Sequence, residues 1–406
     1  MNPPPNRLSI AEFASLAALL FSLVALSIDA MLPAMGKIAN DLGVADRNDA
    51  QLVIGVFFLG NAFGQLLFGP LSDTFGRKRV IVAGLALFLF GCLVSVVAQS
   101  FSVLMIGRLL QGLGAAGPRT VTVSMVRDLY SGRAMARIMS ISMSIFILVP
   151  IIAPAVGQVI LWVANWRYIF GTFFLTGFIA LFWLVIRQPE TLPVSGRHPL
   201  KFAALAAGFM TVCRSRVAVG YTLAMGAMFG AFVGFLSSVQ QIFQDVFGVG
   251  DQFPFYFAVL AVFFGVASLI NARIVVRFGM KIIVSLAMAF SALVSTVYLV
   301  FCLSVDTPGL LSFMLWGGLC FLGIGLVIGN INALAMEPLG KIAGLGAALV
   351  GFLSSFISFL LGVPIGRAFD GTVLPMITGF MVLGTVSLIL ILWTGRYTEA
   401  SDTPTD

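Results

Sequence analysis

Twelve runs of apolar residues, most of them about twenty residues long, occupy most of the sequence. A helix needs about 20 mostly apolar residues to cross the hydrocarbon core of a bilayer. The runs lie at residues 13–35, 51–70, 80–98, 102–125, 138–162, 167–187, 218–239, 254–272, 282–303, 309–335, 342–366 and 374–394. We therefore expect an all-α membrane protein whose twelve transmembrane helices form two halves of six helices each.

The composition excludes a soluble protein. Hydrophobic residues make up 60% of the 406 residues and charged residues 10%, whereas roughly 25% of a typical globular chain is charged. The net charge of +7 would suggest a nucleic-acid partner in a soluble chain. Here we expect the lipid bilayer as partner and no nucleic acid, because the basic residues are sorted by side.

The 23 Lys and Arg residues are distributed unevenly between alternate loops. With the N-terminus placed in the cytoplasm, 17 fall on the cytoplasmic side, 4 on the opposite side and 2 inside a span. Cytoplasmic loops of membrane proteins carry an excess of Lys and Arg. We therefore expect a multi-pass protein of the bacterial inner membrane with both termini in the cytoplasm and no cleavable signal.

A polar linker at residues 188–217 divides the twelve runs into two sets of six. The expected order is a cytoplasmic tail at 1–12, a bundle at 13–187, the linker, a bundle at 218–394 and a cytoplasmic tail at 395–406. Residues 200–213 of the linker are apolar but too short to span, so we expect an interfacial helix there. FGRK at residues 75–78 recurs as FGMK at 278–281, which indicates the internal repeat typical of transporters.

Few residues in the sequence could support enzyme chemistry. The four cysteines lack metal-ligand spacing, and the single histidine, His198, lies in the polar linker. The sequence has no G-x-x-x-x-G-K-S/T motif of an ATP-driven pump. We therefore expect no enzyme activity, no metal and no cofactor, and we expect a monomer.

Two residues of opposite charge lie inside the predicted spans at similar depth. Asp29 is about six residues before the outer end of the first span, and Arg108 is about six residues after the outer start of the fourth. At about 1.5 Å per residue, each lies about 9 Å below the outer surface. A charge in hydrocarbon is costly and usually faces a partner or a cavity. We interpret the pair as a candidate for proton coupling, in which Arg108 favours the ionised carboxylate when it is near; a fixed ion pair that only joins two helices is the alternative.

Arg119 is the third ionisable residue inside a span. It follows Arg108 by eleven residues, almost three helical turns, and therefore shares a helix face with Arg108. Gln111 lies along the same side. Arg119 either lines the inner mouth of a substrate cavity, together with Gln111, or extends to the cytoplasmic headgroups.

Uncharged amides recur within the spans. Most such amides in membrane proteins bond a neighbouring helix, but some contact the substrate. The candidates for the wall of the substrate cavity are Asn61 and Gln65, spaced i,i+4 in the second run, and Asn330 and Asn332 in the tenth.

The stretch GPLSDTFGRKR at residues 69–79 separates the second and third runs and carries several charges in what we expect to be a tight turn. Gly69 and Gly76 suit a backbone that turns sharply. Asp73 would face the positive N-terminal end of the next helix. Taken by itself, the stretch would also fit a solvated positive loop.

The same stretch resembles the signature loop of the major facilitator superfamily, G-x-L-x-D-x-x-G-R-K/R, which lies between the second and third helices of that family. The resemblance implies a twelve-helix transporter. It also implies a conformational latch that joins the two halves at the cytoplasmic face in the outward-open state, made by Gly69, Asp73, Gly76, Arg77 and Arg79.

Two further stretches resemble motifs of the proton antiporters of this superfamily. LMIGRLLQGLGAA is similar to the fourth-helix motif, whose arginine, here Arg108, is associated with proton transfer. VPIIAPAVGQ is similar to the fifth-helix motif and implies a gate helix with Pro150, Pro154 and Gly157. Two prolines four residues apart remove helix hydrogen bonds and bend a span, although membrane helices also tolerate proline without a special role.

Five shorter matches occur in order along the chain: IDAMLPAM, VRDLYSGRA, NWRYIF, PETL and GNINALAMEPLGKIAG. Together they resemble the bicyclomycin and chloramphenicol resistance (Bcr/CflA) group of drug:proton antiporters over almost the whole chain. Asp29 matches the acid before the Leu-Pro pair of that group. Arg119 departs from the group, in which a small or apolar residue is expected.

The resemblance implies a proton-coupled secondary transporter that exports small amphipathic compounds or drugs by alternating access. In this interpretation Asp29 carries the proton and Arg108 tunes its affinity. An importer, exporter or uniporter of a specific metabolite on the same fold is the main alternative. A membrane enzyme or receptor would need polar catalytic groups or a larger soluble domain than the linker at 188–217.

Overall fold

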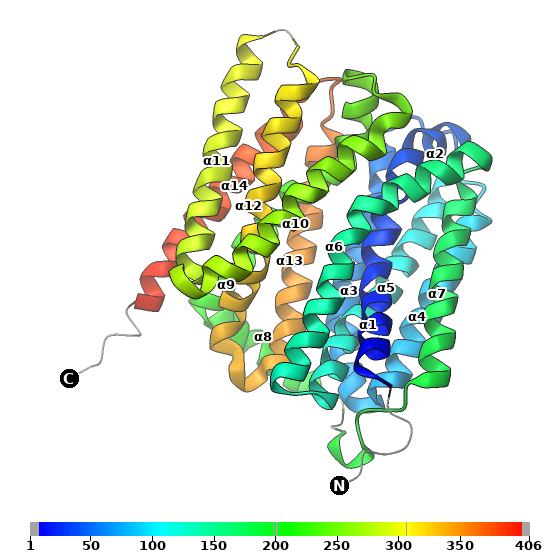
Figure 1. The fold of residues 1–406 in the computed structure, drawn as a ribbon, viewed down its shortest axis with the longest axis vertical. Helices are drawn as coiled ribbons and strands as arrows, with labels where there is room; N and C mark the ends of the chain where they lie inside the picture. The colour runs from blue at the N-terminus through cyan, green and yellow to red at the C-terminus, as the bar shows by residue number, and fades with distance from the viewer. Residues whose placement is uncertain (1–7, 198, 200–201, 306, 400–406) are drawn as a thin grey trace. The chain divides into compact units, whose positions relative to one another are not determined.

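The computed structural model describes residues 8–197, 199, 202–305 and 307–399 (Figure 1). His198 and the ends of both predicted tails lie outside the described residues. Among the described residues the regular elements are all helices, and twelve of them have at least 20 residues. The predicted all-α fold with twelve spans is therefore confirmed.

The first six long helices correspond closely to the first six apolar runs. They are α1 (Ile10–Asp29), α3 (Leu52–Phe75), α4 (Arg77–Val96), α5 (Phe101–Leu129), α6 (Gly132–Val163) and α7 (Arg167–Arg187). Short helical segments join them: η1 (Leu32–Ala34), α2 (Met35–Asp41), η2 (Arg47–Gln51) and, after α7, η3 (Val194–Gly196).

The remaining six long helices follow α8 (Phe202–Arg214), whose 13 residues are fewer than a span needs. They are α9 (Arg216–Gln241), α10 (Phe253–Phe278), α11 (Met280–Ser304), α12 (Leu310–Met336), α13 (Ala343–Arg367) and α14 (Leu374–Glu399). The short segments are η4 (Ile242–Val246), η5 (Gly250–Gln252) and η6 (Glu337–Ile342).

Eleven helical stretches of the described chain are long and apolar enough to cross a membrane. The twelfth long helix, α5, has 29 residues and is less apolar. The reason is chemical, since α5 carries Arg108, Arg119 and Gln111 within its length. The helix with the weakest membrane signal therefore carries three of the eight predicted proton-coupling and cavity residues.

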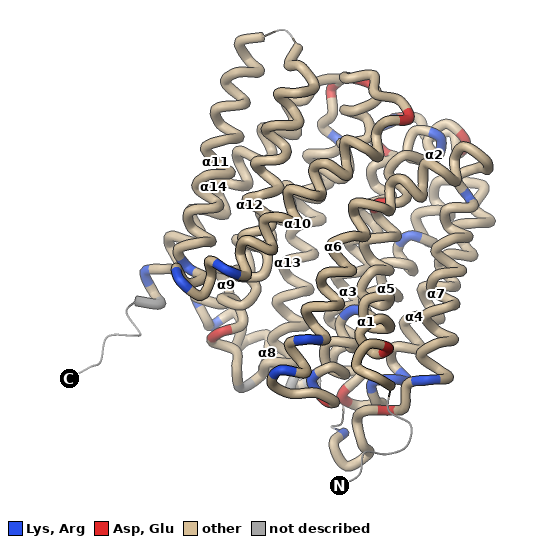
Figure 2. Tube along the Cα trace, in the orientation of Figure 1, with Lys and Arg blue, Asp and Glu red and all other residues tan. Residues whose placement is uncertain are grey.

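The chain forms two compact units. The first comprises Met1–Ala45 and Val56–Ala204, and the second comprises Asp46–Gly55 and Leu205–Asp406. In the first unit α4 packs on α5 and α7, and α1 packs on α6. In the second unit α9 packs on α13 and α14, and α12 packs on α10 and α11. In each unit most Lys and Arg residues lie at one end of the helices (Figure 2).

Close helix packing in the first unit depends on glycine. A Cβ atom on Gly60 of α3 would overlap the carbonyl oxygen of Leu109 in α5, and one on Gly112 of α5 would overlap that of Phe57. Small residues let the backbones of membrane helices approach this closely. Helices α3 and α5 are therefore fixed against each other along residues 57–64.

The first span was predicted as one continuous helix over residues 13–35, and this is wrong. Helix α1 ends at Asp29, and a turn leads into η1, where Pro33 lacks the N–H that a continuing helix would use. The apolar helical stretch then runs on to Asp41. Asp29 therefore lies twelve residues before the end of this stretch instead of six, and its similar depth to Arg108 does not follow from the boundaries.

The predicted turn at residues 69–79 is also wrong. Helix α3 continues through Pro70 to Phe75, and Gly76 alone separates it from α4. Gly76 has φ 102° and ψ 152°, a conformation that is essentially restricted to glycine. Gly279, at the equivalent place between α10 and α11, has φ 78° and ψ 157°. The FGRK and FGMK repeat thus marks the same backbone junction in both units.

Candidate functional site

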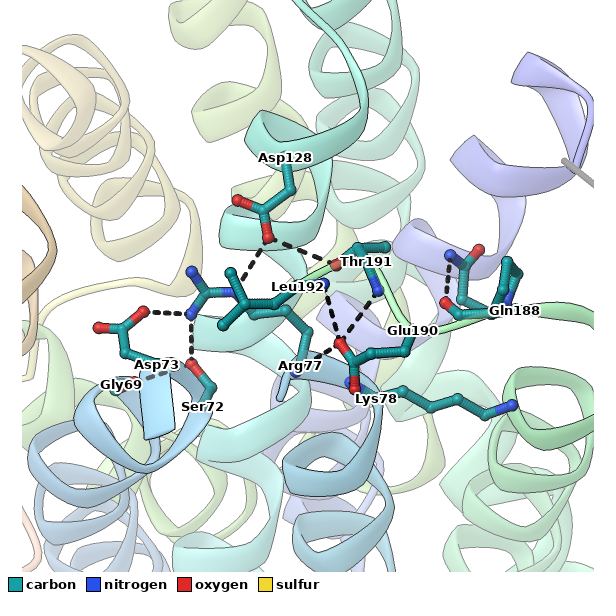
Figure 3. A network of polar contacts seen from close by, with 11 residues as sticks. Gly69, Ser72, Asp73, Arg77, Lys78, Asp128, Gln188, Glu190, Thr191 and Leu192 are labelled. Atoms are coloured by element: carbon teal, nitrogen blue, oxygen red, sulfur yellow. Dashed lines mark hydrogen bonds and ion pairs between the residues drawn. The ribbon is translucent and has the colours of Figure 1, made fainter. Parts of the chain in front are cut away.

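A network of charged residues surrounds the start of α4 in the first unit (Figure 3). Arg77 is buried, with 5% of the residue's surface exposed. Its Nε donates to Oδ2 of Asp128 at 3.0 Å, and its Nη1 donates to Oδ1 of Asp73 at 2.5 Å and to Oγ of Ser72 at 2.7 Å. Arg77 is therefore paired with two carboxylates, which offsets the cost of burying its charge.

The carboxylate of Glu190 binds the N-terminus of α4. Its Oε1 accepts the backbone N–H groups of Arg77, Thr191 and Leu192 at 2.8, 3.0 and 3.1 Å, and its Oε2 accepts that of Lys78 at 3.2 Å. An anion at this position satisfies free N–H groups and interacts favourably with the helix dipole. The expectation that Asp73 faces this dipole is wrong, because Asp73 lies within α3 and Glu190 occupies the position.

Two residues of this network, Asp128 and Glu190, were not among the predicted site residues. Asp128 also accepts a hydrogen bond from Oγ1 of Thr191 at 3.3 Å, so it connects Arg77 to the segment after α7. Both acids lie in stretches that the sequence singled out, VRDLYSGRA and PETL. An acidic residue at or just after the end of a predicted helix, within each stretch, was the pattern that could have indicated them.

The other predicted latch residues lie at the edge of this network. Gly69 accepts a hydrogen bond from Oγ of Ser72 at 2.7 Å through its carbonyl oxygen. A Cβ atom on Gly76 would collide with the carboxylate of Glu190. Arg79 is exposed. Of the two predicted arginines, Arg77 is thus the one held by the network.

Asp29 is buried at the C-terminal end of α1, with 5% of its surface exposed. The backbone of the next residue, Ala30, lies very close to α6: a Cβ atom on Gly157 of α6 would overlap the carbonyl oxygen of Ala30. The residue that follows Asp29 is therefore packed on the predicted gate helix α6.

Arg108 is fully buried in α5. Its Nη1 donates to Oε1 of Gln111 at 2.7 Å, and the guanidinium lies 4.6 Å from the ring centroid of Phe57. Gln111 in turn donates from Nε2 to the carbonyl oxygen of Gly91 at 3.1 Å and to Oγ of Ser95 at 2.8 Å. Gln111 therefore orients Arg108 while tying α5 to α4.

The predicted cavity amides are largely engaged within the protein. Gln65 donates to Oδ1 of Asn61 at 2.9 Å, and Asn61 donates to the carbonyl oxygen of Gly112 at 3.4 Å. Asn330 donates to Oδ1 of Asn271 at 2.7 Å and to the carbonyl oxygen of Leu326 at 2.9 Å. The bonds from Asn61 to Gly112 and from Asn330 to Asn271 join neighbouring helices, and the other two lie within one helix.

The side chains of Arg119 and Asn332 are exposed. In the predicted gate helix, Pro150 and Pro154 lie inside α6, which is continuous from Gly132 to Val163.

The sequence profile of the Major Facilitator Superfamily matches residues 17–363. The chain belongs to this superfamily. It is therefore a multi-pass membrane transporter, and small molecules are its substrates. The two corrected boundaries, at the ends of α1 and α3, leave the number of long helices unchanged.

Curated relatives place the resemblance more narrowly. The chain is 30% identical to the uncharacterized MFS-type transporter YdgK of Bacillus subtilis, over 88% of this chain and 89% of that protein. It is 29% identical to the bicyclomycin resistance protein homolog of Haemophilus influenzae, over 90% of each chain. Multidrug resistance protein D of Escherichia coli is 26% identical over 81% of this chain and 82% of that protein. The predicted resemblance to the Bcr/CflA efflux group is confirmed.

Solved structures agree on the fold. A peptide transporter in complex with sulfate matches with a TM-score of 0.73 at 17% identity, over 96% of this chain and 94% of that one. A D-xylose-proton symporter matches with a TM-score of 0.72 at 15% identity, over 94% and 95% of the two chains. At such identities the match establishes the fold of this transporter and leaves its substrate open.

Proposed function

We propose that this transporter exports small amphipathic compounds or drugs from the bacterial cytoplasm in exchange for protons, by alternating access in the inner membrane. Both termini would lie in the cytoplasm, as the distribution of Lys and Arg favours. Support for the substrate class comes from the relatives named for multidrug and bicyclomycin resistance.

The observation that carries the proton-coupling proposal is the buried carboxylate of Asp29. An acid inside a membrane helix is costly and is usually functional. Asp29 lies next to Ala30, whose carbonyl oxygen packs against Gly157 of α6. A movement of α6 against α1 would therefore change the surroundings of this carboxylate first, and with them its affinity for a proton.

We propose that Arg108 acts on the same step from α5. In this structure its guanidinium donates to Gln111 and faces the Phe57 ring. A guanidinium that moves from a neutral amide to a carboxylate gains a charge-assisted hydrogen bond, which is stronger than the one it leaves. Arg108 would thus favour release of the proton from Asp29 in the state that brings the two together.

The substrate would contact the exposed polar side chains, Arg119 and Asn332. Four further amides would position the helices that carry this surface through their hydrogen bonds: Gln111, Asn61, Gln65 and Asn330. The Arg77 network would act as the latch of the cytoplasmic face, with Asp128 and Glu190 as added members.

The test is export by the Asp29→Asn variant in an efflux-deficient bacterial host. A panel of toxic compounds is scored for resistance, with and without a protonophore, and export is then followed in vesicles with an imposed pH gradient. The matched control is Asp41→Asn, an acid of the same apolar stretch whose side chain is 51% exposed. We expect Asp29→Asn to abolish gradient-driven export while the protein remains folded, and Asp41→Asn to export normally.

Two outcomes would contradict the proposal. If Asp29→Asn exports as well as the unmodified protein under a pH gradient, Asp29 does not carry the proton. If resistance in the host is unaffected by the protonophore, export is not proton-coupled. Size-exclusion chromatography of each purified variant excludes misfolding as the cause of a loss.

A further inference from the structure

Arg119 is an exposed residue on a face of α5 that is otherwise largely buried. At 3.6 residues per turn, Arg108 and Val126 lie within about 20° of Arg119 around the helix axis, and both are fully buried. Ile106 and Leu109 are exposed apolar residues of the same helix, and they lie about 140° and 80° away from Arg119. The exposed arginine therefore does not belong to the side of α5 on which these apolar residues are exposed.

Helix α3 covers the Arg119 face of α5 only before the level of Arg119. A Cβ atom on Gly112, seven residues earlier and on the same face, would overlap the carbonyl oxygen of Phe57 in α3. A Cβ atom on Gly117 would instead meet the ring of Phe68 at 3.2 Å, and Gly117 lies about 160° from Arg119 around the helix. The contact with α3 has thus moved to the opposite face of α5 by the level of Arg119, and this leaves the guanidinium uncovered by α3.

The first unit supplies no countercharge to Arg119. Among the described residues, Arg119 makes no hydrogen bond or ion pair. The acids of the first unit other than Asp29 have partners elsewhere: Glu12 pairs with Arg187, Asp41 with Arg167, Asp73 and Asp128 with Arg77, and Glu190 with the start of α4. A cation inside a membrane helix usually has a partner, and here a bound anion would be that partner.

The nearest end of α5 and the start of α6 are basic. Arg127 follows Arg119 by eight residues, about 12 Å along the helix axis, and Arg133 and Arg137 follow in the first turns of α6. All three arginines are exposed. A surface of one sign raises the local concentration of ions of the opposite sign. This end of the first unit therefore favours the approach of anions.

We propose that Arg119 binds the acidic group of an amphipathic organic anion, a carboxylate or sulfonate on an apolar body, and that such anions are substrates of this transporter. A guanidinium binds an oxyanion through parallel, charge-assisted N–H···O bonds. Val123, one turn further along α5, is 41% exposed and offers an apolar contact to the body of the molecule. The inference names the substrate class of the export function proposed above and rests on it.

The first experiment compares two dyes that differ by one charged group. Anilinonaphthalene sulfonate is an amphipathic anion, and phenylnaphthylamine is the same molecule without the sulfonate. The affinity of each dye is measured by equilibrium dialysis against the purified protein in a nonionic detergent. We expect Arg119→Gln to weaken binding of the sulfonate at least tenfold and binding of the amine less than twofold. Arg119→Lys keeps the charge, so it should weaken sulfonate binding by only about threefold.

The matched control is Arg273→Gln, which removes an exposed arginine near the end of α10 in the second unit. We expect both affinities to stay within twofold of those of the unmodified protein. Undetectable binding of the sulfonate by the unmodified protein, or binding that Arg119→Gln leaves unchanged, would overturn the proposal. An equal loss of both dyes in Arg119→Gln would also overturn it, because Arg119 would then support the structure and not bind the anion.

A second measurement asks whether this face of α5 meets water or lipid. Val123→Cys is made in a Cys213→Ser background, because Cys213 is exposed and the other three cysteines are buried. Its modification by a negatively charged, water-soluble methanethiosulfonate is timed in inside-out vesicles. We expect anilinonaphthalene sulfonate to slow the reaction at least fivefold, and we expect this protection to disappear when Arg119→Gln is added. A Val123→Cys residue that does not react would place this face in lipid, with a lipid phosphate as the partner of Arg119, and would overturn the proposal.

The outcome for the anion site is separable from that for proton coupling, because neither measurement uses a proton gradient. Selective loss of sulfonate binding in Arg119→Gln, together with protonophore-insensitive export, would keep the anion site and refute proton coupling. Protonophore-sensitive export by a protein that does not bind the sulfonate would keep the coupling and refute the anion site.

Discussion

The helix junction at Gly76 in the first unit and the junction at Gly279 in the second have the same backbone and different surroundings. Both glycines have positive φ and directly precede the following helix. A Cβ on Gly76 would meet the carboxylate of Glu190, whereas among the described residues a Cβ on Gly279 would meet no atom within 4 Å. The repeat thus preserved the turn and left its neighbours free to diverge.

The difference between the two junctions shows which residues form the charged network. Arg77, which follows Gly76, is paired with Asp73 and Asp128, whereas its counterpart after Gly279 is Met280. A buried guanidinium requires countercharges, but a methionine requires none. The backbone junction is therefore a feature of the fold, and the charged network is a feature of the first unit.

The largest expected effect comes from removing the charge at the first junction. Arg77→Ala removes the hydrogen bonds of the buried guanidinium to Asp128, Asp73 and Ser72, so we expect the free energy of unfolding to fall by about 3 kcal/mol. Met280→Ala, at the equivalent position, should cost less than about 1 kcal/mol. Unfolding in mixed micelles with increasing SDS measures both. Equal losses would show that the network contributes no more than ordinary packing.

A smaller effect is expected from the glycines themselves. Gly279→Ala should cost about 1–2 kcal/mol, because its backbone conformation strains any side chain. Gly76→Ala should cost about 1 kcal/mol more, because the new methyl group must also displace Glu190 from the start of α4. The same SDS titration compares the two variants. A Gly279→Ala loss as large as that of Gly76→Ala would mean that Glu190 moves aside freely.

The smallest effect is expected from Glu190→Gln. The glutamine keeps one carbonyl oxygen for the backbone N–H groups of Arg77, Thr191 and Leu192 but loses the negative charge at the helix N-terminus. We expect a loss of about 1 kcal/mol, which shrinks at high salt because the dipole interaction is screened. Unfolding at low and high salt measures it. A loss that does not change with salt would assign Glu190 a hydrogen-bonding role alone.

Much of the fold could be predicted from the sequence because a bilayer imposes a simple length rule. Among the described residues, eleven of the twelve long helices begin within three residues of the start of a predicted run, since apolar length alone selects them. The errors came where backbone chemistry overrides hydropathy. Pro33 interrupts the first run, whereas Pro70 lies inside α3 without interrupting it, as membrane helices allow where neighbouring groups satisfy the freed backbone carbonyl.

Candidate residues were harder to predict than helices. The sequence selected Arg77, Asp29 and Arg108 because charge is rare in the spans. It did not select Asp128 or Glu190, which lie at helix ends where charge is common. Their roles depend on contacts between segments about 50 and 110 residues apart, and no local pattern encodes such contacts.

The sequence by itself determined the number of spans, the family and the residues whose charge is unusual in a membrane. Composition and spacing are sufficient for these features, because the cost of placing a polar group in hydrocarbon depends on each residue by itself. Only the tertiary structure decided that Glu190 binds the start of α4, that Arg108 faces Gln111, and that α3 begins in one unit and continues in the other. Those features depend on tertiary contacts between helices, and these contacts are determined by the packing of the whole chain.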